Sequence, residues 1–185
     1  RDTFAQDKFS YIFRRTSNNH FQGCDCAECN FRQDVLAYLE INGTTQQYSQ
    51  AIDQLFDLLK RQYANYEIDD KVWIALRKES QGELGKIKAM LVSAYRGTYT
   101  QEDIQNLIAF YKTDAGKQLL RDQTAMTAQQ REDASVFYNS ETGQKVLNSR
   151  DKISQSVAEV SEIWSRDLYR MMRDKLAEMG YLMQE

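Results

Sequence analysis

The chain has 185 residues, of which 42% are hydrophobic and 28% charged, and its formal net charge is −3. These proportions are ordinary for a globular protein, so they predict one domain, or one domain with an appendage, around a sizeable core. The mixed charges leave no basic footprint, which argues against nucleic acid as the main partner. No apolar run approaches the roughly 18 residues that a transmembrane helix needs.

The first 31 residues form an aromatic, cysteine-containing segment, which we separate from a single helical-bundle domain expected over residues 32–185. The segment holds the only histidine and all three cysteines: His20, Cys24, Cys26 and Cys29. We favour a local disulfide with one spare thiol, as expected of an odd cysteine count in an oxidising compartment. A zinc site is the alternative, because one imidazole and three thiolates complete a tetrahedral shell, although the Cys-x-Cys-x-x-Cys spacing is compressed. Redox catalysis ranks third, because no strand–helix pattern of a thioredoxin-like unit surrounds Cys26 and Cys29.

Helical signals begin soon after this segment. The stretch 35–39 predicts a short amphipathic helix that ends at Asn42-Gly43, a favourable left-handed pair. Thr44 or Thr45 begins the next helix, whose apolar positions recur at helical spacing. Its expected buried face consists of Tyr48, Ile52, Leu55, Phe56, Leu59 and Tyr63.

Further cap signals divide the middle of the chain. Asp69 is a good N-cap for a third helix, Ser80 is a point at which that helix restarts, and Arg96-Gly97 ends it. Thr100 with Asp103 approximates a capping box for the following helix. No stretch alternates apolar and polar residues long enough to predict a strand. The fold class expected is therefore all-α, a multi-helix bundle of antiparallel helical hairpins with one long C-terminal helix.

One eleven-residue stretch occurs twice, at 110–120 and at 137–147. Its threonine or serine is suited to cap a new helix, and the acidic residue that follows meets the positive end of the helix dipole. Its glycine costs roughly 1 kcal/mol of helix propensity against alanine, which predicts a close backbone approach by a crossing helix. The repeat therefore reads as a helix-to-helix junction. The signature residues are Phe110, Tyr111, Thr113 and Gly116 in the first copy and Phe137, Tyr138, Ser140 and Gly143 in the second.

The first copy also carries a family resemblance. Tyr99-Thr100-Gln101-Glu102-Asp103-Ile104, followed by Phe110-Tyr111-Lys112-Thr113-Asp114-Ala115-Gly116-Lys117, resembles a bacterial envelope family known only as a domain of unknown function. The resemblance covers roughly residues 33–122, with a second signature at 137–147. The family often has proline after the Ser/Thr, whereas this chain has Asp114 and Glu141 there. The resemblance implies a helical fold and a periplasmic or secreted location, with a signal peptide removed, and it assigns no catalytic residue.

A long C-terminal helix is expected from about Glu141 to Met179, more than about 50 Å at 1.5 Å per residue. The compact aliphatics of its first half, Val146, Ile153, Val157 and Val160, suit a tight seam in the bundle. Its second half contains larger or more flexible side chains, which either complete the core or form a partner surface. These candidates are Trp164, Tyr169, Met171, Met172 and Met179.

No catalytic constellation stands out, because any scheme that needs histidine must use His20. We therefore expect a protein that is not an enzyme and has no cofactor, unless zinc is bound. The function hypothesis is a non-enzymatic helical module of the bacterial envelope, which binds an unidentified envelope protein, an apolar ligand or a second copy of the chain in a homodimer. The alternative is a zinc- or thiol-dependent activity of His20 and the three cysteines.

Overall fold

The computed structural model describes residues 27–183, and within that range every regular element is helical. This confirms the all-α prediction and the long C-terminal helix. The elements are α2 (Ala27–Ile41), α3 (Thr44–Gln62), α4 (Asp70–Arg96), α5 (Gln101–Tyr111), α6 (Asp114–Arg121), the short 3-10 helix η1 (Gln123–Ala125), α7 (Ala128–Tyr138) and α8 (Glu141–Glu178).

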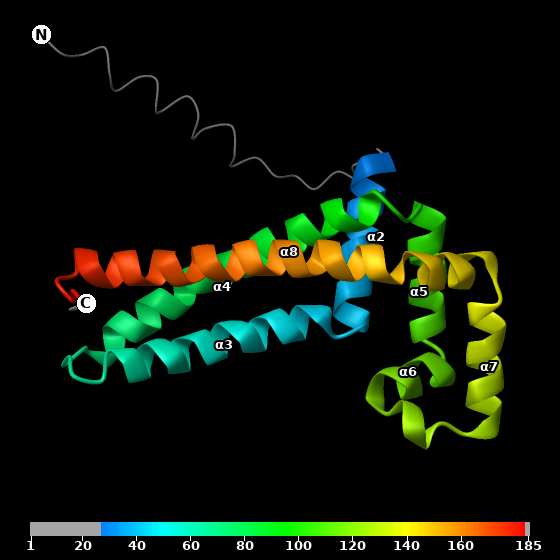
Figure 1. Cartoon of the computed structure of the whole chain (residues 1–185), viewed down its shortest axis with the longest axis horizontal. Coiled ribbons are helices and arrows are strands. Elements are labelled where there is room, and N and C mark those ends of the chain that lie inside the picture. The colour runs from blue at the N-terminus through cyan, green and yellow to red at the C-terminus, as the bar shows by residue number, and fades with distance from the viewer. Residues whose placement is uncertain (1–26, 184–185) are drawn as a thin grey trace, which may run out of the picture.

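Helix α8 runs along the whole length of the molecule (Figure 1). Helix α3 lies beneath its C-terminal half, while α4, antiparallel to α3, starts beneath α8, passes behind it and packs against it. Near its other half, α2 and α5 pack against each other and cross the long axis steeply. Helices α6 and α7 pack together at the end farthest from the C-terminus. The long helix thus joins a three-helix body to a lobe that contains the repeated stretch.

Most of these helices begin at a side-chain cap that can be read from the sequence. The capping oxygen accepts a backbone N–H two or three residues further on, which satisfies a donor that the first helical turn leaves unpaired. Asp69 and the Thr100–Asp103 capping box are confirmed. Helix α3 differs, because Gly43 at its N-cap has a φ of 81° and the Asn42 side chain accepts from the Thr44 N–H at 3.0 Å.

The expected restart at Ser80 is wrong, because α4 is one continuous helix of 27 residues. The Ser80 hydroxyl is buried and donates to the Leu76 carbonyl oxygen at 2.7 Å. A serine in mid-helix can satisfy its hydroxyl in this way without interrupting the helix. A serine is compatible with either a helix start or a helix interior, and here the apolar face that runs along α4 favours the continuous helix.

The main core lies between α2, α3, α4, α5 and the second half of α8. The tight seam expected in the first half of α8 is not seen, because its aliphatics are only partly buried, whereas the second half completes the core, as the favoured interpretation expected. Both α3 and α4 contact the second half: Tyr48 lies edge-on to Trp164, whose indole N–H donates to the Glu83 carbonyl oxygen at 2.8 Å. The fully buried residues there are Trp164, Leu168, Met172 and Leu176, each 4% exposed or less.

Helix α2 spans the expected boundary between residues 31 and 32, and Phe31 packs into the main core. The described part of the bundle therefore starts at Ala27. Residues 1–26 and 184–185 lie outside the described structure.

Candidate functional site

The two copies of the repeated stretch form the same helix-to-helix junction. In the first, the Thr113 hydroxyl accepts the Gly116 N–H at 3.1 Å and donates to the Phe110 carbonyl oxygen at 2.6 Å. In the second, Ser140 accepts from Gly143 at 3.1 Å and donates to Phe137 at 2.5 Å. A single hydroxyl in each copy therefore connects the end of one helix to the start of the next.

The glycines are required by the junction itself, and the expected crossing helix is wrong. A Cβ atom added at Gly116 would lie 2.1 Å from the Phe110 carbonyl oxygen and 2.6 Å from the Tyr111 Cα. At Gly143 the corresponding contacts are 2.1 Å to the Phe137 oxygen and 2.5 Å to the Tyr138 Cα. The close approach is made by the last turn of the preceding helix, because the chain folds back on itself within a few residues.

The repeat is longer than its signature, because α5 with α6 corresponds to α7 with the start of α8 at an offset of 27 residues. Helices α5 and α7 each have 11 residues, and both start with a capping box, Thr100–Asp103 and Thr127–Gln130. Sequence reasoning missed α7, although Thr127-x-x-Gln130 is the same signal that identified α5. The chain therefore carries a duplicated helix–junction–helix unit.

The two units pack against each other through their signature phenylalanines. Phe110 and Phe137 stack with ring centroids 4.1 Å apart and planes 6° from parallel. Phe110 also belongs to a small second core with Ala115, Met126 and Ala134. The phenylalanine of each junction thus covers the phenylalanine ring of the other.

A chain of buried tyrosines extends from the first junction into the main core. Tyr111 lies 5.9 Å from Tyr38, Tyr38 lies 5.9 Å from Tyr95, and Tyr95 lies 5.9 Å from Tyr99, measured between ring centroids. The Tyr99 hydroxyl reaches Ser149 at 3.0 Å. Burial raises the pKa of Tyr95 to about 12 and raises the pKa values of Tyr38 and Tyr111 further, so these phenols stay neutral. We call Tyr38, Tyr95, Tyr99 and Tyr111 the tyrosine chain.

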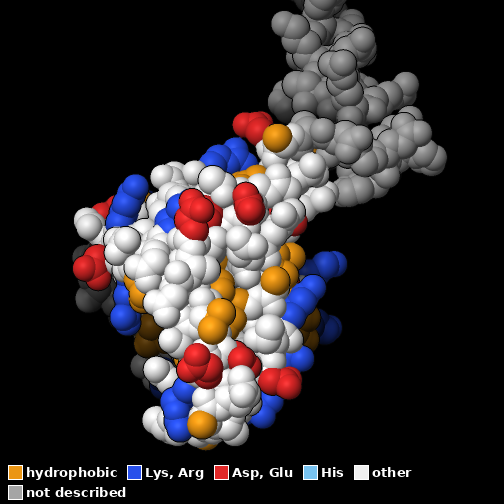
Figure 2. Space-filling view, turned by 90° about the vertical axis from the view of Figure 1, so that its right-hand side faces the viewer, with side chains coloured by type: hydrophobic (Ala, Val, Ile, Leu, Met, Phe, Trp, Pro, Cys, Tyr) orange, Lys and Arg blue, Asp and Glu red, His pale blue; other side chains and the backbone are white. Residues whose placement is uncertain are grey.

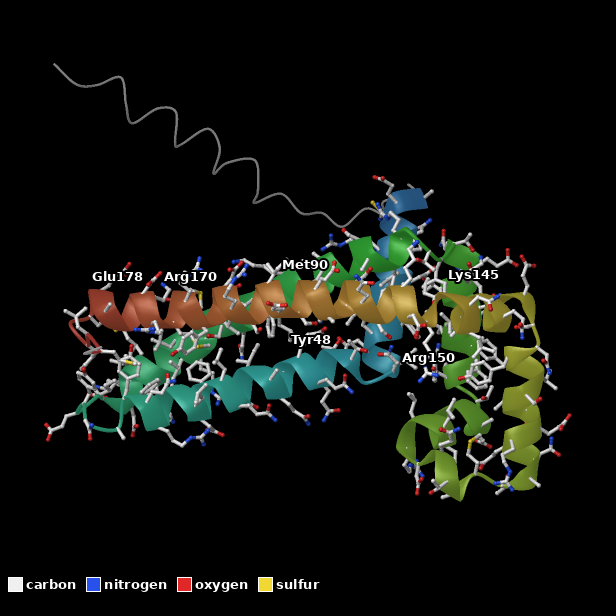
Figure 3. The ribbon with its side chains drawn as sticks, in the orientation of Figure 1. Tyr48, Met90, Lys145, Arg150, Arg170 and Glu178 are labelled. Atoms are coloured by element: carbon white, nitrogen blue, oxygen red, sulfur yellow. The ribbon has the colours of Figure 1, made fainter. Side chains whose placement is uncertain are left out.

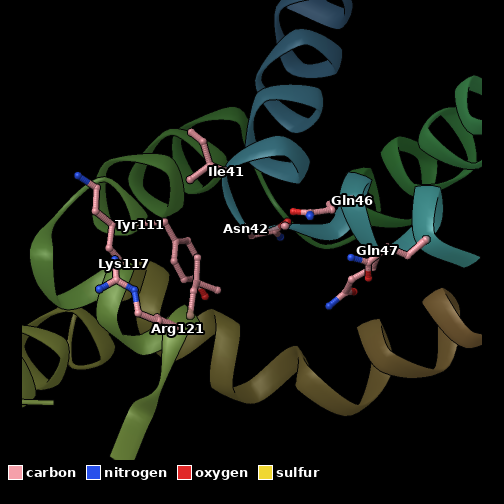
Figure 4. Close-up of a pocket in the computed structure, with 10 residues that line it drawn as sticks. Ile41, Asn42, Gln46, Gln47, Tyr111, Lys117 and Arg121 are labelled. Carbon is pink, nitrogen blue, oxygen red and sulfur yellow. The ribbon is translucent and has the colours of Figure 1, made fainter. Parts of the chain in front are cut away.

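One end of the tyrosine chain opens into a cleft of about 500 Å³ between the α2–α3 turn and α6, which we call the first cleft (Figure 4). Tyr111, Lys117 and Arg121 lie on one side, with Gln46 and Gln47 opposite. None of the described residues that line it is acidic. Its lining residues are Ile41, Asn42, Gly43, Gln46, Gln47, Gln50, Tyr111, Lys117, Leu120 and Arg121.

A second cleft, of about 560 Å³, lies where the α4–α5 turn meets the start of α8. Ser149, the hydrogen-bond partner of Tyr99, is part of its lining. Gln144 and Asn148 also line it, and they are the repeat counterparts of Lys117 and Arg121. One wall of each cleft is therefore related by the repeat, but the second cleft has amides at these two positions and is also lined by Glu141, Lys145 and Lys152.

Beside the second cleft, Asp103 forms a polar network that sequence reasoning did not identify. Its side chain is 6% exposed, forms an ion pair with Lys145 and accepts from the Thr142 hydroxyl at 3.0 Å. Asn106 donates to the same Thr142 oxygen at 3.0 Å. Burial alone raises the pKa of Asp103, but hydrogen bonds from Lys145, Thr100 and Thr142 outweigh it and hold that pKa below its usual range. The network ties the start of α5 to the start of α8, where Figure 3 labels Lys145.

The candidate partner surface on α8 is divided between core and exterior. Trp164 and Met172 are core residues, so neither is available to a partner in this fold. Tyr169 and Met171 are partly buried, and the Tyr169 hydroxyl donates to the Gln62 side chain at 2.9 Å. Met179, with 49% of its surface exposed, is the accessible member of the set.

The cysteine and histidine candidates are mostly outside the described residues. Cys29 is half-buried in the first turn of α2, whereas His20, Cys24 and Cys26 precede the described range. The disulfide and the zinc site therefore stay predictions. Within residues 27–183, no cluster of three or more His, Cys, Asp or Glu residues has the arrangement of a metal site.

The surface at the α5–α7 end mixes acidic and basic side chains, with hydrophobic side chains in small separate groups (Figure 2). Exposed apolar residues on α7 and α8 include Val136 and Leu147. In the described part of the chain, no helix is both long and apolar enough to cross a membrane.

Comparison with known proteins identifies one family. The profile of a family described as "Uncharacterized protein conserved in bacteria (DUF2059)" matches residues 85–130 and again residues 123–170. No curated protein and no solved structure matches the chain. The matches begin later than the resemblance expected from residue 33, and each spans one of the two junctions. Over residues 85–170 the chain is therefore similar to this uncharacterized bacterial family, whose profile matches it twice.

Proposed function

We propose that this protein is a non-enzymatic binding module of the bacterial envelope, and that its first cleft receives a segment of a partner protein. The proposal rests on which elements form the walls of the first cleft. Tyr111, Lys117 and Arg121 all come from the first junction unit, and the α2–α3 turn forms the facing wall. The first junction unit and the α2–α3 turn thus form a concave polar surface.

The non-enzymatic part of the proposal is supported by what the buried polar groups do. The Asp103 carboxylate is committed to the network with Lys145 and Thr142, and the Glu83 carboxylate pairs with Lys86 at 2.6 Å. Burial raises the pKa values of the Tyr38, Tyr95 and Tyr111 phenols. Because these groups stabilise contacts between or within helices, a structural role accounts for their burial and pKa shifts, and a catalytic role is not needed to explain them.

A protein segment fits the first cleft better than an apolar ligand does. Sites for small apolar ligands are enclosed and lined mainly by hydrophobic side chains. The first cleft is open and is lined mostly by amide, phenol and cationic groups, with Ile41 and Leu120 as its larger aliphatic residues. Amide side chains can both donate to and accept from a peptide backbone.

The envelope location rests on the resemblance of the signature and on the cysteine-rich segment, which suits an oxidising compartment. Fractionation of the native cells, with the protein detected by antibody, tests this part of the proposal. Recovery in the periplasmic or secreted fraction supports it, and recovery in the cytoplasmic fraction contradicts it. Metal analysis with a thiol count on the same material tests the alternative, since one bound zinc and no disulfide would favour it.

Site-specific photo-crosslinking tests the binding function. A photoreactive residue at Gln47, in the first cleft, is compared in native cells with the same residue at Lys78, an exposed position on the first half of α4. We expect a discrete protein adduct from Gln47 and none from Lys78. The same adducts from both positions, or none from Gln47, would refute binding at the first cleft.

A further inference from the structure

We infer that the partner segment recognised by the first cleft is acidic. This inference rests on the proposed binding function and adds the chemistry of its ligand. The chain as a whole has more acidic than basic residues, 27 against 24. The lining of the first cleft reverses that balance, with two cations, Lys117 and Arg121, and no acidic residue among the described residues that form it.

The two cations of the first cleft also have no partner among the described residues. Neither Lys117 nor Arg121 makes an ion pair or side-chain hydrogen bond with another described residue. Some other cations in the described structure have carboxylate partners, such as Arg77 with Asp53, Lys88 with Glu40 and Lys175 with Glu79, whereas others, such as Lys78 and Arg170, have none among the described residues. Two neighbouring cations without an anion repel each other, so a carboxylate placed between them gains attraction from both.

Positive charge near the first cleft is reinforced from α8. Figure 3 shows Arg150 extending from α8 on the side where the α2–α3 turn and α6 lie. Burial raises the pKa of the Tyr138 phenol, and the Arg150 guanidinium opposes that rise. A third cation on this side of the molecule favours the approach of a negatively charged segment.

The opposite wall supplies the groups that hold a peptide backbone. Gln46 and Gln50 are one helical turn apart on α3, with Gln47 beside them, so all three amides are available along one edge of the cleft. Their side chains make no hydrogen bond to other described residues. An extended segment lying in the cleft can thus hydrogen-bond to α3 while its Asp or Glu side chains reach Lys117 and Arg121 on α6.

Selection from a displayed library of random linear peptides tests the ligand chemistry with the full chain as bait. Enriched peptides are then measured by fluorescence polarisation against the parent, the double variant Lys117→Gln/Arg121→Gln and the control Lys78→Gln/Arg170→Gln. The control removes two exposed cations from other parts of the surface, so it matches the change in net charge. Thermal melting of all three proteins checks that they are equally folded.

We expect enrichment of peptides rich in Asp and Glu. Their affinity should fall roughly tenfold in the Lys117→Gln/Arg121→Gln variant, stay unchanged in the control and weaken with added salt. Enriched peptides that are neutral or apolar, or that bind the two variants equally, would overturn the acidic ligand. An absence of enriched peptides would also overturn it. In each of these cases, crosslinking at Gln47 decides separately whether the first cleft binds a partner.

Discussion

Replacing either junction glycine by alanine should destabilise the protein, although alanine is the better helix former. At Gly116 the new Cβ atom would lie 2.1 Å from the Phe110 carbonyl oxygen, whereas ordinary contact starts at 3.4 Å. The two backbones must therefore separate by about 1.3 Å, the difference of these distances. Neither atom belongs to a flexible side chain, so rotation about a side-chain bond cannot relieve the clash.

The energy follows from what this separation disturbs. Overpacking of this kind costs about 1–3 kcal/mol, and weakening the Thr113 cap adds about 1 kcal/mol. Alanine returns about 1 kcal/mol of helix propensity. We therefore expect Gly116→Ala to lower the free energy of unfolding by about 2 kcal/mol, and Gly143→Ala to do the same. The double variant should cost less than the sum, because the stacked Phe110 and Phe137 couple the two junctions.

Urea unfolding followed by far-ultraviolet circular dichroism measures these changes. Gly82→Ala and Gly85→Ala are matched controls, since both glycines are in α4 and a Cβ atom there has nothing within 4 Å. Each control should stabilise the protein by about 0.5–1 kcal/mol, so the expected sign is opposite at the two kinds of site. The reasoning fails if Gly116→Ala and Gly143→Ala are as stable as the parent.

Three further predictions concern the polar network, the tyrosine chain and α8. Asp103→Asn should lower the free energy of unfolding by about 2 kcal/mol, because it removes a buried charge that Lys145 and three hydrogen bonds satisfy. The pKa of Asp103 is lower in the folded protein than in the unfolded chain, where it is about 3.9. Its contribution to the free energy of unfolding is therefore present above that value and is lost as pH falls through the folded pKa. Urea unfolding at acid pH should accordingly show a weaker pH dependence in the variant than in the parent. Tyr38, Tyr95 and Tyr111 have raised pKa values, so their contribution to the free energy of unfolding is complete below the unfolded pKa of about 10 and is lost as pH rises further. Their phenolate absorbance should appear together with unfolding. Reversible titration of all tyrosines in the folded protein would contradict this. Truncation after Arg166 removes Leu168, Met172 and Leu176, each worth about 2–5 kcal/mol as a buried side chain, and should abolish cooperative thermal unfolding.

The helix starts could be predicted from the sequence because a cap is a local interaction. Thr100 and Asp103 are three residues apart, and their reciprocal hydrogen bonds form wherever that helix packs. The same holds for Thr113 and Ser140 at the junctions. The close backbone approach at the junction glycines could also be predicted, because a poor helix former that is present in both copies indicates a steric requirement.

The identity of each packing partner could not be predicted in this way. The backbone that approaches Gly116 belongs to the residues just before it, and this follows from the angle of the junction, which local propensities do not determine. The buried half of α8 depends on where α3 and α4 lie, because Trp164 meets Tyr48 and Glu83 from those helices. The Asp103 network likewise joins residues about 40 positions apart, at a distance that no cap pattern reports.

The duplication explains why the two junction units differ at the positions that face their clefts. The second unit leads into α8, so its first turn lies against α5 and contributes Thr142 and Lys145 to the network around Asp103. Lys145 is thereby neutralised, and its unit carries Gln144 and Asn148 where the first has Lys117 and Arg121. The first unit leads into the short α6, which faces the α2–α3 turn across open space, and its two cations meet no carboxylate among the described residues. One copy thus uses a charge within the fold, while the cations of the other meet no carboxylate in the described structure, which is why we propose an acidic ligand for the first cleft.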